Sequence, residues 1–300
     1  MKNEDQQYRP RLSKEEYEVV LAMKNGWKPK LSELSEFNVD TTRKTPAKVL
    51  IFDVETAPLK TYVWGLWDQN VQTNHIISDW FMLTWSAKWL FSSDVMSDGL
   101  TSAEALVQDD RRVTASIWKL LDEADIIIAH NAIKFDVKKL NTRFLLNELN
   151  PPMPYQVIDT LLHLRNKFSL SSNKLDYACQ MLGLEGKMDT GGFELWDGCI
   201  KGDKNSLAKM EEYNRKDVVI LEDLYLRIRS WIRPHPNMGL FIEDDVAVCP
   251  SCASKKITFG GTPYRTSASA FESFRCDDCG SVGRSKKSNH KISATRSVPK

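Results

Sequence analysis

Two acidic residues follow an apolar run near residue 50. Residues Val49–Phe52 are apolar without alternation, which is typical of a strand buried on both faces, and Asp53 and Glu55 come next. Side chains two residues apart on a strand point to the same face, so these carboxylates would lie together. Buried like charges repel each other, and a bound cation would stabilise both. The alternative is that the strand ends at Phe52 and both acids begin a solvated turn before Pro58.

A third acid, Asp136, falls in the first turn of a predicted helix. The apolar run Ile126–Ala129 is a second candidate for a buried strand, and the helix follows it after a short exit. Asp136 lies four residues before Leu140, close to the side of the helix that would face the core. The alternative is that Asp136 only complements the dipole of the helix, as acids in a first turn commonly do.

A fourth acid, Asp217, interrupts the apolar stripe of a long helix that we predict to begin with Ser206 as its cap and to run to about Ile232. Tyr213 lies four residues earlier, so the two side chains are neighbours on that face. A Tyr–Asp hydrogen bond at the edge of the core is the alternative. Two divalent cations close together need several carboxylates from different elements, and these four acids would supply them.

Two cysteine pairs lie toward the C-terminus. Cys249 and Cys252 form one C-x-x-C pair, and Cys276 and Cys279 form the second. This pattern predicts one structural zinc ion held by four thiolates in a ribbon, with no open position for catalysis. The two remaining cysteines, Cys179 and Cys199, are expected to be packing residues.

Strand-like and helical patterns alternate through the middle of the chain, which predicts an α/β domain over residues 46–236. Residues 1–45 would form an N-terminal helix, capped by Ser13 and Glu16, with a linker. Residues 237–284 would form the zinc ribbon, and residues 285–300 a basic disordered tail.

Composition favours a folded protein rather than a disordered chain. Hydrophobic residues make up 42% of the 300 residues, and the net charge is +1. Ten Lys and Arg residues but three acids lie between Ser251 and Lys300, so the C-terminal part is basic and is a candidate for binding nucleic acid, although a solvated tail is the alternative. We expect neither a secretory signal nor a membrane span, and hence a soluble cytoplasmic protein.

Three segments resemble the motifs of the DEDD exonuclease superfamily. They are Asp53-Val54-Glu55-Thr56, His130-Asn131 with Phe135-Asp136, and Tyr213-Asn214-Arg215-Lys216-Asp217. The tyrosine four residues before the last aspartate resembles the DEDDy branch. The sequence is most similar to the exonuclease domain of family B DNA polymerases and to its stand-alone phage and bacterial relatives, over about Lys48 to Trp231.

The resemblance implies a ribonuclease H-like mixed sheet flanked by helices, with the first strand central and Asp79–Phe91 as an antiparallel neighbour. It also implies that four acids hold two Mg²⁺ or Mn²⁺ ions: Asp53, Glu55, Asp136 and Asp217. Tyr213 would orient the attacking water through its hydroxyl. Asn131 and Phe135 would contact the terminal nucleotides, with ordinary roles in a turn and in the core as the alternative.

The expected activity is 3′→5′ hydrolysis of single-stranded DNA ends to nucleoside 5′-monophosphates in phage or bacterial replication or repair. A DNA polymerase or another replisome protein is the expected partner, with proofreading in trans, in a bacterial or phage-infected cell. The alternatives are a 3′ exonuclease of RNA, and a nucleic-acid or replisome-binding adaptor with secondary nuclease activity. The segment around Trp64 and Trp67 belongs to none of these motifs.

Overall fold

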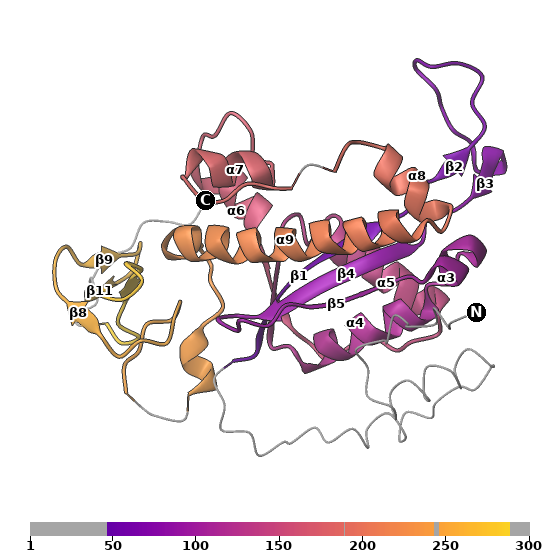
Figure 1. Ribbon diagram of the computed structural model, residues 1–300. Coiled ribbons are helices and arrows are strands. Elements are labelled where there is room, and N and C mark those ends of the chain that lie inside the picture. Colours follow the sequence, from indigo (N-terminus) through magenta and orange to yellow (C-terminus); the bar gives the residue numbers. More distant parts are fainter. Residues whose placement is uncertain (1–46, 189, 243–245, 289–300) are drawn as a thin grey trace. The chain divides into compact units, whose positions relative to one another are not determined.

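A computed structural model describes residues 47–188, 190–242 and 246–288 of the chain (Figure 1). Its described residues divide into two compact units, one from Lys48 to Leu224 and one from Tyr225 onward. The predicted N-terminal helix and residues 289–300 of the basic tail lie outside the described residues.

A five-stranded mixed sheet forms the centre of the first unit. Its order is β5-β4-β1-β6-β7, with β1 antiparallel to β4 and parallel to β6. This confirms the prediction of a mixed α/β sheet with the first strand at its centre, and of an antiparallel neighbour from the Trp-rich stretch. The strands are β1 (Val49–Thr56), β4 (Met82–Trp89), β5 (Met96–Gly99), β6 (Ile126–Ala129) and β7 (Gln156–Asp159).

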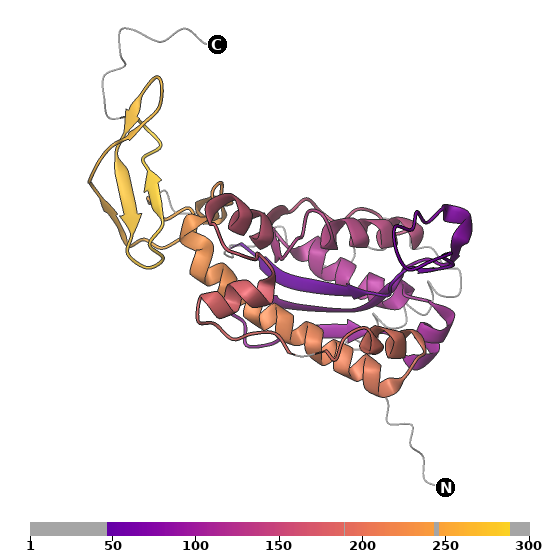
Figure 2. The ribbon, with the colours of Figure 1, turned by 90° about the horizontal axis from the view of Figure 1, so that it is seen from above.

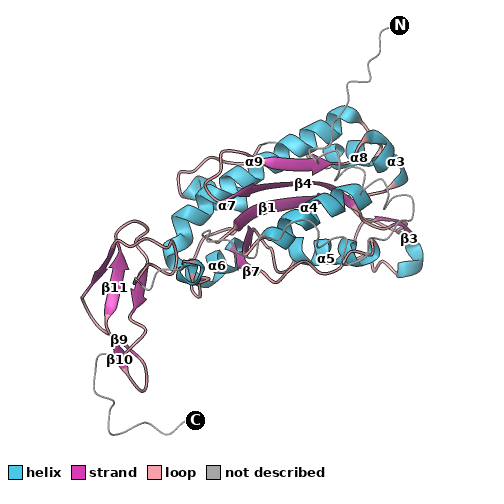
Figure 3. Cartoon of the chain, turned by 90° about the horizontal axis from the view of Figure 1, so that it is seen from below, coloured by secondary structure: helices cyan, strands magenta, loops and turns pink. Residues whose placement is uncertain are grey.

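Helices cover both faces of this sheet. Seen from above and from below, the sheet lies between α9 on one face and α4 with α5 on the other (Figures 2 and 3). Continuous apolar runs in β1 and β6 are required because both faces of these strands are buried. The helices are α3 (Ser102–Val107), α4 (Arg111–Glu123), α5 (Asp136–Leu146), α6 (Thr160–Lys167), α7 (Leu175–Met181), α8 (Glu194–Ile200) and α9 (Lys204–Ile228).

The long helix begins earlier than the sequence indicated. We predicted Ser206 as the cap, whereas α9 begins at Lys204 and Asp203 precedes it. The carboxylate of Asp203 accepts hydrogen bonds from the backbone N–H and the hydroxyl of Ser206, both at 2.7 Å. Ser206 therefore donates to the capping group instead of acting as the cap, because Asp is as good a cap and lies three residues ahead of it.

A buried arginine ties the edge strand β5 to α3 and α4. Arg112 of α4 donates to Asp98 of β5 at 2.6 Å, to Glu104 of α3 at 2.8 Å and to the carbonyl of Gly99 at 2.7 Å. Because each of the three charges has hydrogen-bonding partners, the free-energy cost of removing them from water is offset. The antiparallel half of the sheet is therefore fixed at its outer edge.

A projecting hairpin separates β1 from β4. Its short strands, β2 (Lys60–Thr61) and β3 (Ile76–Ser78), pair antiparallel, with the 3-10 helix η1 (Thr73–His75) just before β3. Figure 1 shows the loop between β2 and β3 extending away from the end of the sheet. The backbone N–H of Ala57 donates to the carbonyl of Phe81 at 2.8 Å, so both roots of the hairpin are held beside the sheet.

The second unit contains a small antiparallel sheet of order β12-β11-β8 and a two-stranded sheet of β9 and β10. The ring of Phe274 lies so close to Gly283 that a Cβ atom there would come within 2.2 Å of it, and this contact requires glycine. The elements are η2 (Arg229–Trp231), η3 (Met238–Phe241), β8 (Ile257–Phe259), β9 (Tyr264–Arg265), β10 (Ala270–Phe271), β11 (Ser273–Cys276) and β12 (Val282–Arg284).

Among the described residues, no helix combines the length and the apolar character that crossing a membrane requires.

Candidate active site and cysteine cluster

The end of β1 places two carboxylates where the sheet is open on one side. β1 pairs with β4 over its length, whereas its ladder with β6 ends at Ile51. Asp53 and Glu55 follow that point and lie on one face of the strand, as the alternation of side chains predicts. Strand β1 continues to Thr56, so the alternative of a solvated turn beginning after Phe52 is wrong.

Helix α9 brings a third carboxylate to the same place. Carboxylate oxygens of Asp53, Glu55 and Asp217 all lie within 4.8 Å of one another. The side-chain amide of Asn214, one turn before Asp217, donates to Asp53 at 2.7 Å and is fully buried. A residue 161 positions away along the chain thus orients the first carboxylate.

Asp136 lies close enough to this group to feel its charge, but it is not part of the group. It is the first residue of α5 and only 1% exposed, and its oxygens are not among the three carboxylates that lie within 4.8 Å. After burial, the charge of Asp53 is the main cause that raises the pKa of Asp136. Neither of its carboxylate oxygens has a partner of good hydrogen-bond geometry among the described residues, although the backbone N–H groups of Asp136 and Val54 act to lower its pKa.

Burial raises the pKa of all four acids, and the charge of another acid of the group adds to this at Asp53, Glu55 and Asp136. Burial, followed by the charge of Asp217, raises the pKa of Asp53 to about 7. Burial and the charge of Asp53 raise the pKa of Glu55 to about 8. Burial also raises the pKa of Asp217, although the ammonium of Lys187 opposes that shift. Ionising the whole group near neutral pH therefore requires additional positive charge.

The group has the chemistry of a site for divalent cations. Oxygen donors are the ligands that Mg²⁺ and Mn²⁺ prefer, and unpartnered buried oxygens remain on both Asp136 and Asp217. Buried polar atoms are rarely left without partners, so these oxygens fit the role of ligands. The residues present therefore suit the bound ions that the sequence predicted.

Lys187 is a site residue that the sequence analysis missed. Its ammonium lies 2.9 Å from the hydroxyl of Tyr213 and forms a short ion pair with Asp217. Although burial opposes the charge, Asp217 and Asp53 raise the pKa of Lys187 above its usual value. This lysine therefore stays protonated and supplies part of the positive charge that the acids need.

Tyr213 lies between Lys187 and an aromatic neighbour. It is 8% exposed, and its ring packs edge-on against Trp196 of α8 with centroids 6.4 Å apart. Trp196 also forms a hydrogen bond with Glu55, which lowers the pKa of that carboxyl against the effect of burial. Lys187 and Trp196 carry no periodic signal, whereas Asn214 could have been found from its place on the same stripe of α9.

The loop before α5 presents the two predicted substrate-binding residues. Asn131 has a positive φ of 79°, a conformation that asparagine tolerates better than most residues. The carboxylate of Asp159 accepts the backbone N–H groups of Asn131 and Ile133, both at 3.1 Å, and so fixes this loop. Phe135 is 36% exposed and immediately precedes Asp136. Its exposure makes the alternative of a core residue wrong.

His130 in the same motif is placed as a structural residue. Burial lowers its pKa to about 4, so the ring is neutral near pH 7. Its Nε2–H donates to the carbonyl of Asn173 at 3.0 Å, which leaves Nδ1 to accept from the hydroxyl of Thr160 at 2.9 Å. Both ring nitrogens therefore serve to hold the end of β6.

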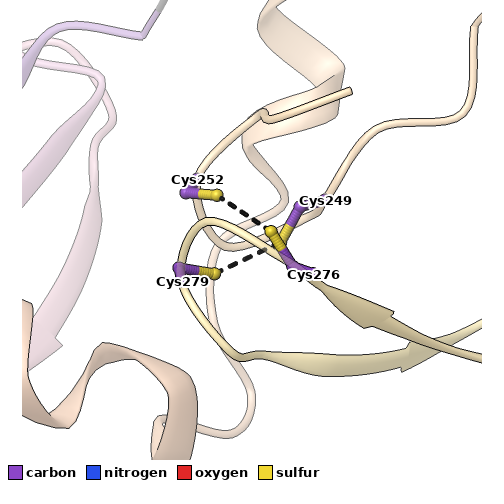
Figure 4. A group of neighbouring side chains, drawn as sticks. All are labelled: Cys249, Cys252, Cys276 and Cys279. Atoms are coloured by element: carbon purple, nitrogen blue, oxygen red, sulfur yellow. Dashed lines mark hydrogen bonds between the residues drawn. The ribbon is translucent and has the colours of Figure 1, made fainter. Parts of the chain in front are cut away.

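The four C-terminal cysteines meet in one cluster, as Figure 4 shows. Their sulfur atoms lie within 4.8 Å of one another, and the distance is 3.6 Å from Cys249 to Cys279 and from Cys252 to Cys276. A disulfide needs about 2.05 Å, so these are free thiols. Four sulfurs at about 2.3 Å from a tetrahedral zinc ion would lie about 3.8 Å apart, close to the observed distances.

The raised pKa values predict how metal binding depends on pH. Asp53 and Glu55 keep protons in the folded state up to about pH 7 and 8, whereas the unfolded chain loses them near pH 4. The metal-free protein should therefore lose stability as pH rises from about 4 to about 8, because the folded state binds more protons. Saturating Mg²⁺ should raise the melting temperature more at about pH 8 than at about pH 6, as thermal unfolding can measure. An equal increase at both values would contradict this coupling.

A family model agrees with the architecture. A family model described as the RNase_H superfamily matches residues 50–229, more than half of the 300-residue chain, including all four acids and Tyr213. A search of curated proteins finds no match. Among solved structures, the chain is similar to the family B DNA polymerase from the hyperthermophilic archaeon Pyrobaculum calidifontis, at 15% identity and a TM-score of 0.43. That similarity covers 62% of this chain and 25% of the polymerase, so the chain spans about a quarter of its length. On the strength of the family match, the chain belongs to the RNase H superfamily.

Proposed function

We propose that the protein is a metal-dependent 3′→5′ exonuclease that hydrolyses single-stranded DNA to nucleoside 5′-monophosphates. One observation carries the proposal: carboxylate oxygens of Asp53, Glu55 and Asp217 converge within 4.8 Å from a central strand and a long helix. Membership of the RNase H superfamily supports a nuclease. The polarity of cleavage and the preference for DNA rest on the motifs described above.

In this proposal, Asp53, Glu55, Asp136 and Asp217 hold two Mg²⁺ or Mn²⁺ ions. When bound, such ions make water more acidic and stabilise the charge that develops on the phosphate and on the departing 3′ oxygen. The buried Asn214 amide keeps Asp53 in place for this role. The hydroxyl of Tyr213, held at 2.9 Å by the Lys187 ammonium, positions the water that attacks the terminal phosphodiester.

The direct test uses single strands of DNA and RNA labelled at the 5′ end, incubated with Mg²⁺ or with EDTA. A ladder that shortens from the 3′ end, with release of 5′-monophosphates, is expected with Mg²⁺ alone. RNA is the second candidate substrate, because the proposed metal ions act on the phosphate and the 3′ oxygen, which DNA and RNA share. Cleavage within the strand, or cleavage in EDTA, would exclude the proposed reaction.

Asp136→Asn should abolish hydrolysis without unfolding the protein. The substitution keeps the shape of the side chain and removes a buried carboxyl group whose ionisation is disfavoured, so metal-free stability should be equal or higher. Glu212→Gln is the matched control, because Glu212 is exposed on α9 next to Tyr213 and should be dispensable. Full turnover in Asp136→Asn, measured with the labelled DNA, would refute the assignment of this ligand.

Tyr213→Phe removes one hydroxyl and keeps the ring packed against Trp196. If the hydroxyl positions water, kcat should fall by roughly one to three orders of magnitude, with little change in KM or in stabilisation by Mg²⁺. Lys187→Met tests the group that holds the hydroxyl. If both act in one step, the double variant should be no slower than the slower single variant. Additive losses, or an unchanged Tyr213→Phe, would instead mean that Tyr213 has a packing role.

We further propose that the four clustered cysteines bind one structural Zn²⁺, which would stabilise a unit with a small apolar core. Full-length protein purified without added metal should contain about one zinc ion per chain by elemental analysis. Cys276→Ser should lose it, while Cys199→Ala, a change at a buried cysteine of α8, should retain it. Zinc retained by Cys276→Ser would argue against the four-thiolate site.

A polymerase or replisome partner and a bacterial or phage setting stay predictions of the sequence.

A further inference from the structure

The hairpin between β1 and β4 exposes an unusual amount of aromatic surface. We call residues 60–78 the aromatic arm. Trp64 is 94% exposed and Trp67 is 83% exposed, with Tyr62 at 73% and Leu66 at 89%. Single apolar side chains on a surface are ordinary, but five exposed ones within six residues, these four and Val63, form a patch that indicates a binding surface.

The root of the arm is held in place. The strands at its base pair with each other, and the backbone N–H of Tyr62 donates to the carbonyl of His75 at 3.0 Å. The hydroxyl of Thr61 donates to the same carbonyl at 2.9 Å. The exposed rings therefore project from an anchored hairpin that directly follows the strand carrying Asp53 and Glu55 (Figure 1).

The polar residues of the arm indicate what it binds. Between Thr61 and His75 the sole charged residue is Asp68, while four side chains are amides: Gln69, Asn70, Gln72 and Asn74. Such a surface suits neutral, flat rings with hydrogen-bonding edges, and it is poorly suited to phosphate groups. Nucleobases of an unpaired strand have this chemistry, and aromatic rings stack on them with little regard to sequence.

A second cluster links the arm to the carboxylates. Trp80 lies two residues beyond β3, and the ammonium of Lys139 is 3.6 Å from the centre of its ring. Lys139 also lies 5.6 Å from the ring of Phe135, which immediately precedes Asp136. Aromatic and basic groups therefore continue from the root of the arm to the start of α5, where a phosphate backbone would need positive charge.

We propose that the aromatic arm is a stacking platform for unpaired bases of the single-stranded DNA whose 3′ end enters the carboxylate site. This inference rests on the proposed function and adds a binding surface to it. Trp64 is nine positions after Glu55, a stretch of chain that reaches at most about 30 Å. The arm therefore binds bases upstream of the scissile nucleotide, and it acts on affinity for long strands rather than on the chemical step.

The experiment measures binding of a long single-stranded oligonucleotide to the full-length protein in EDTA, by fluorescence anisotropy, and Mg²⁺-dependent hydrolysis separately. Trp64→Ala with Trp67→Ala should weaken binding at least roughly tenfold, since each stacked base contributes about 1–3 kcal/mol. Replacing both tryptophans with Leu keeps the apolar surface but removes the rings, and should weaken binding similarly. Replacing both with Phe should restore most of the affinity. Trp231→Ala, at another exposed tryptophan, is the matched control and should bind as the wild type does.

The kinetic prediction separates the arm from the chemistry. For the long strand, the Ala and Leu variants should have a higher KM and an unchanged kcat. Their rate of hydrolysis of a dinucleotide should equal that of the wild type. Wild-type affinity in both the Ala and the Leu variants would overturn the proposal and favour a protein partner for the arm. Weakened binding by the variants, with no hydrolysis by the wild type or any variant, would support the stacking role of the arm and refute the exonuclease activity. Hydrolysis whose KM is insensitive to these variants would support the exonuclease while refuting the arm.

Discussion

Repulsion among buried carboxylates is the constraint on which the site depends. Asp53, Glu55 and Asp217 lie within 4.8 Å of one another, and the charge of Asp53 also acts on the nearby Asp136. Burial disfavours each charge and every neighbouring acid disfavours it further, so the metal-free group retains protons near neutral pH. Such an arrangement persists only where the surrounding structure holds it against a local free-energy cost. The fully apolar first half of β1 and the long packed face of α9 provide that support.

The residues around the acids reduce this cost in two ways. Lys187 supplies a partly buried positive charge to Asp217, and Asn214 donates a hydrogen bond to Asp53. A divalent ion would compete with Lys187 for Asp217 and would displace protons from the other carboxyl groups, so metal binding, protonation and stability are coupled. Since Lys187 also bonds to Tyr213, the position of the tyrosine hydroxyl is linked to the charge of the site. Asp217 is paired with the ammonium of Lys187, whereas no cation and no side chain among the described residues pairs with Asp136.

The aromatic arm and the carboxylates lie at neighbouring places in the first unit. The strand that carries Asp53 and Glu55 leads directly into the aromatic arm, and the chain returns through Trp80 into β4. Because the root of the arm is fixed to the end of β1, single-stranded DNA bound to the arm would have a defined position relative to the carboxylates. The thiol cluster, in contrast, is complete within the second unit, because all four of its cysteines belong to that unit.

Local sequence patterns were sufficient to predict several elements of the fold and the residues of both clusters. Uninterrupted apolar runs identified β1 and β6, acids within those patterns identified the four carboxylates, and paired spacing identified the thiol cluster, because burial and turn geometry leave periodic traces in a sequence. The same reasoning placed the start of α9 at Ser206, since it could not tell which of two good capping residues would accept the hydrogen bonds. Only the tertiary structure decided that three acids meet while Asp136 lies apart, that Lys187 and Trp196 join the site, and that Trp64 and Trp67 are exposed rather than packed. The physical reason is that periodicity reports whether a side chain is buried, whereas contacts between residues far apart in sequence depend on how whole elements pack against each other.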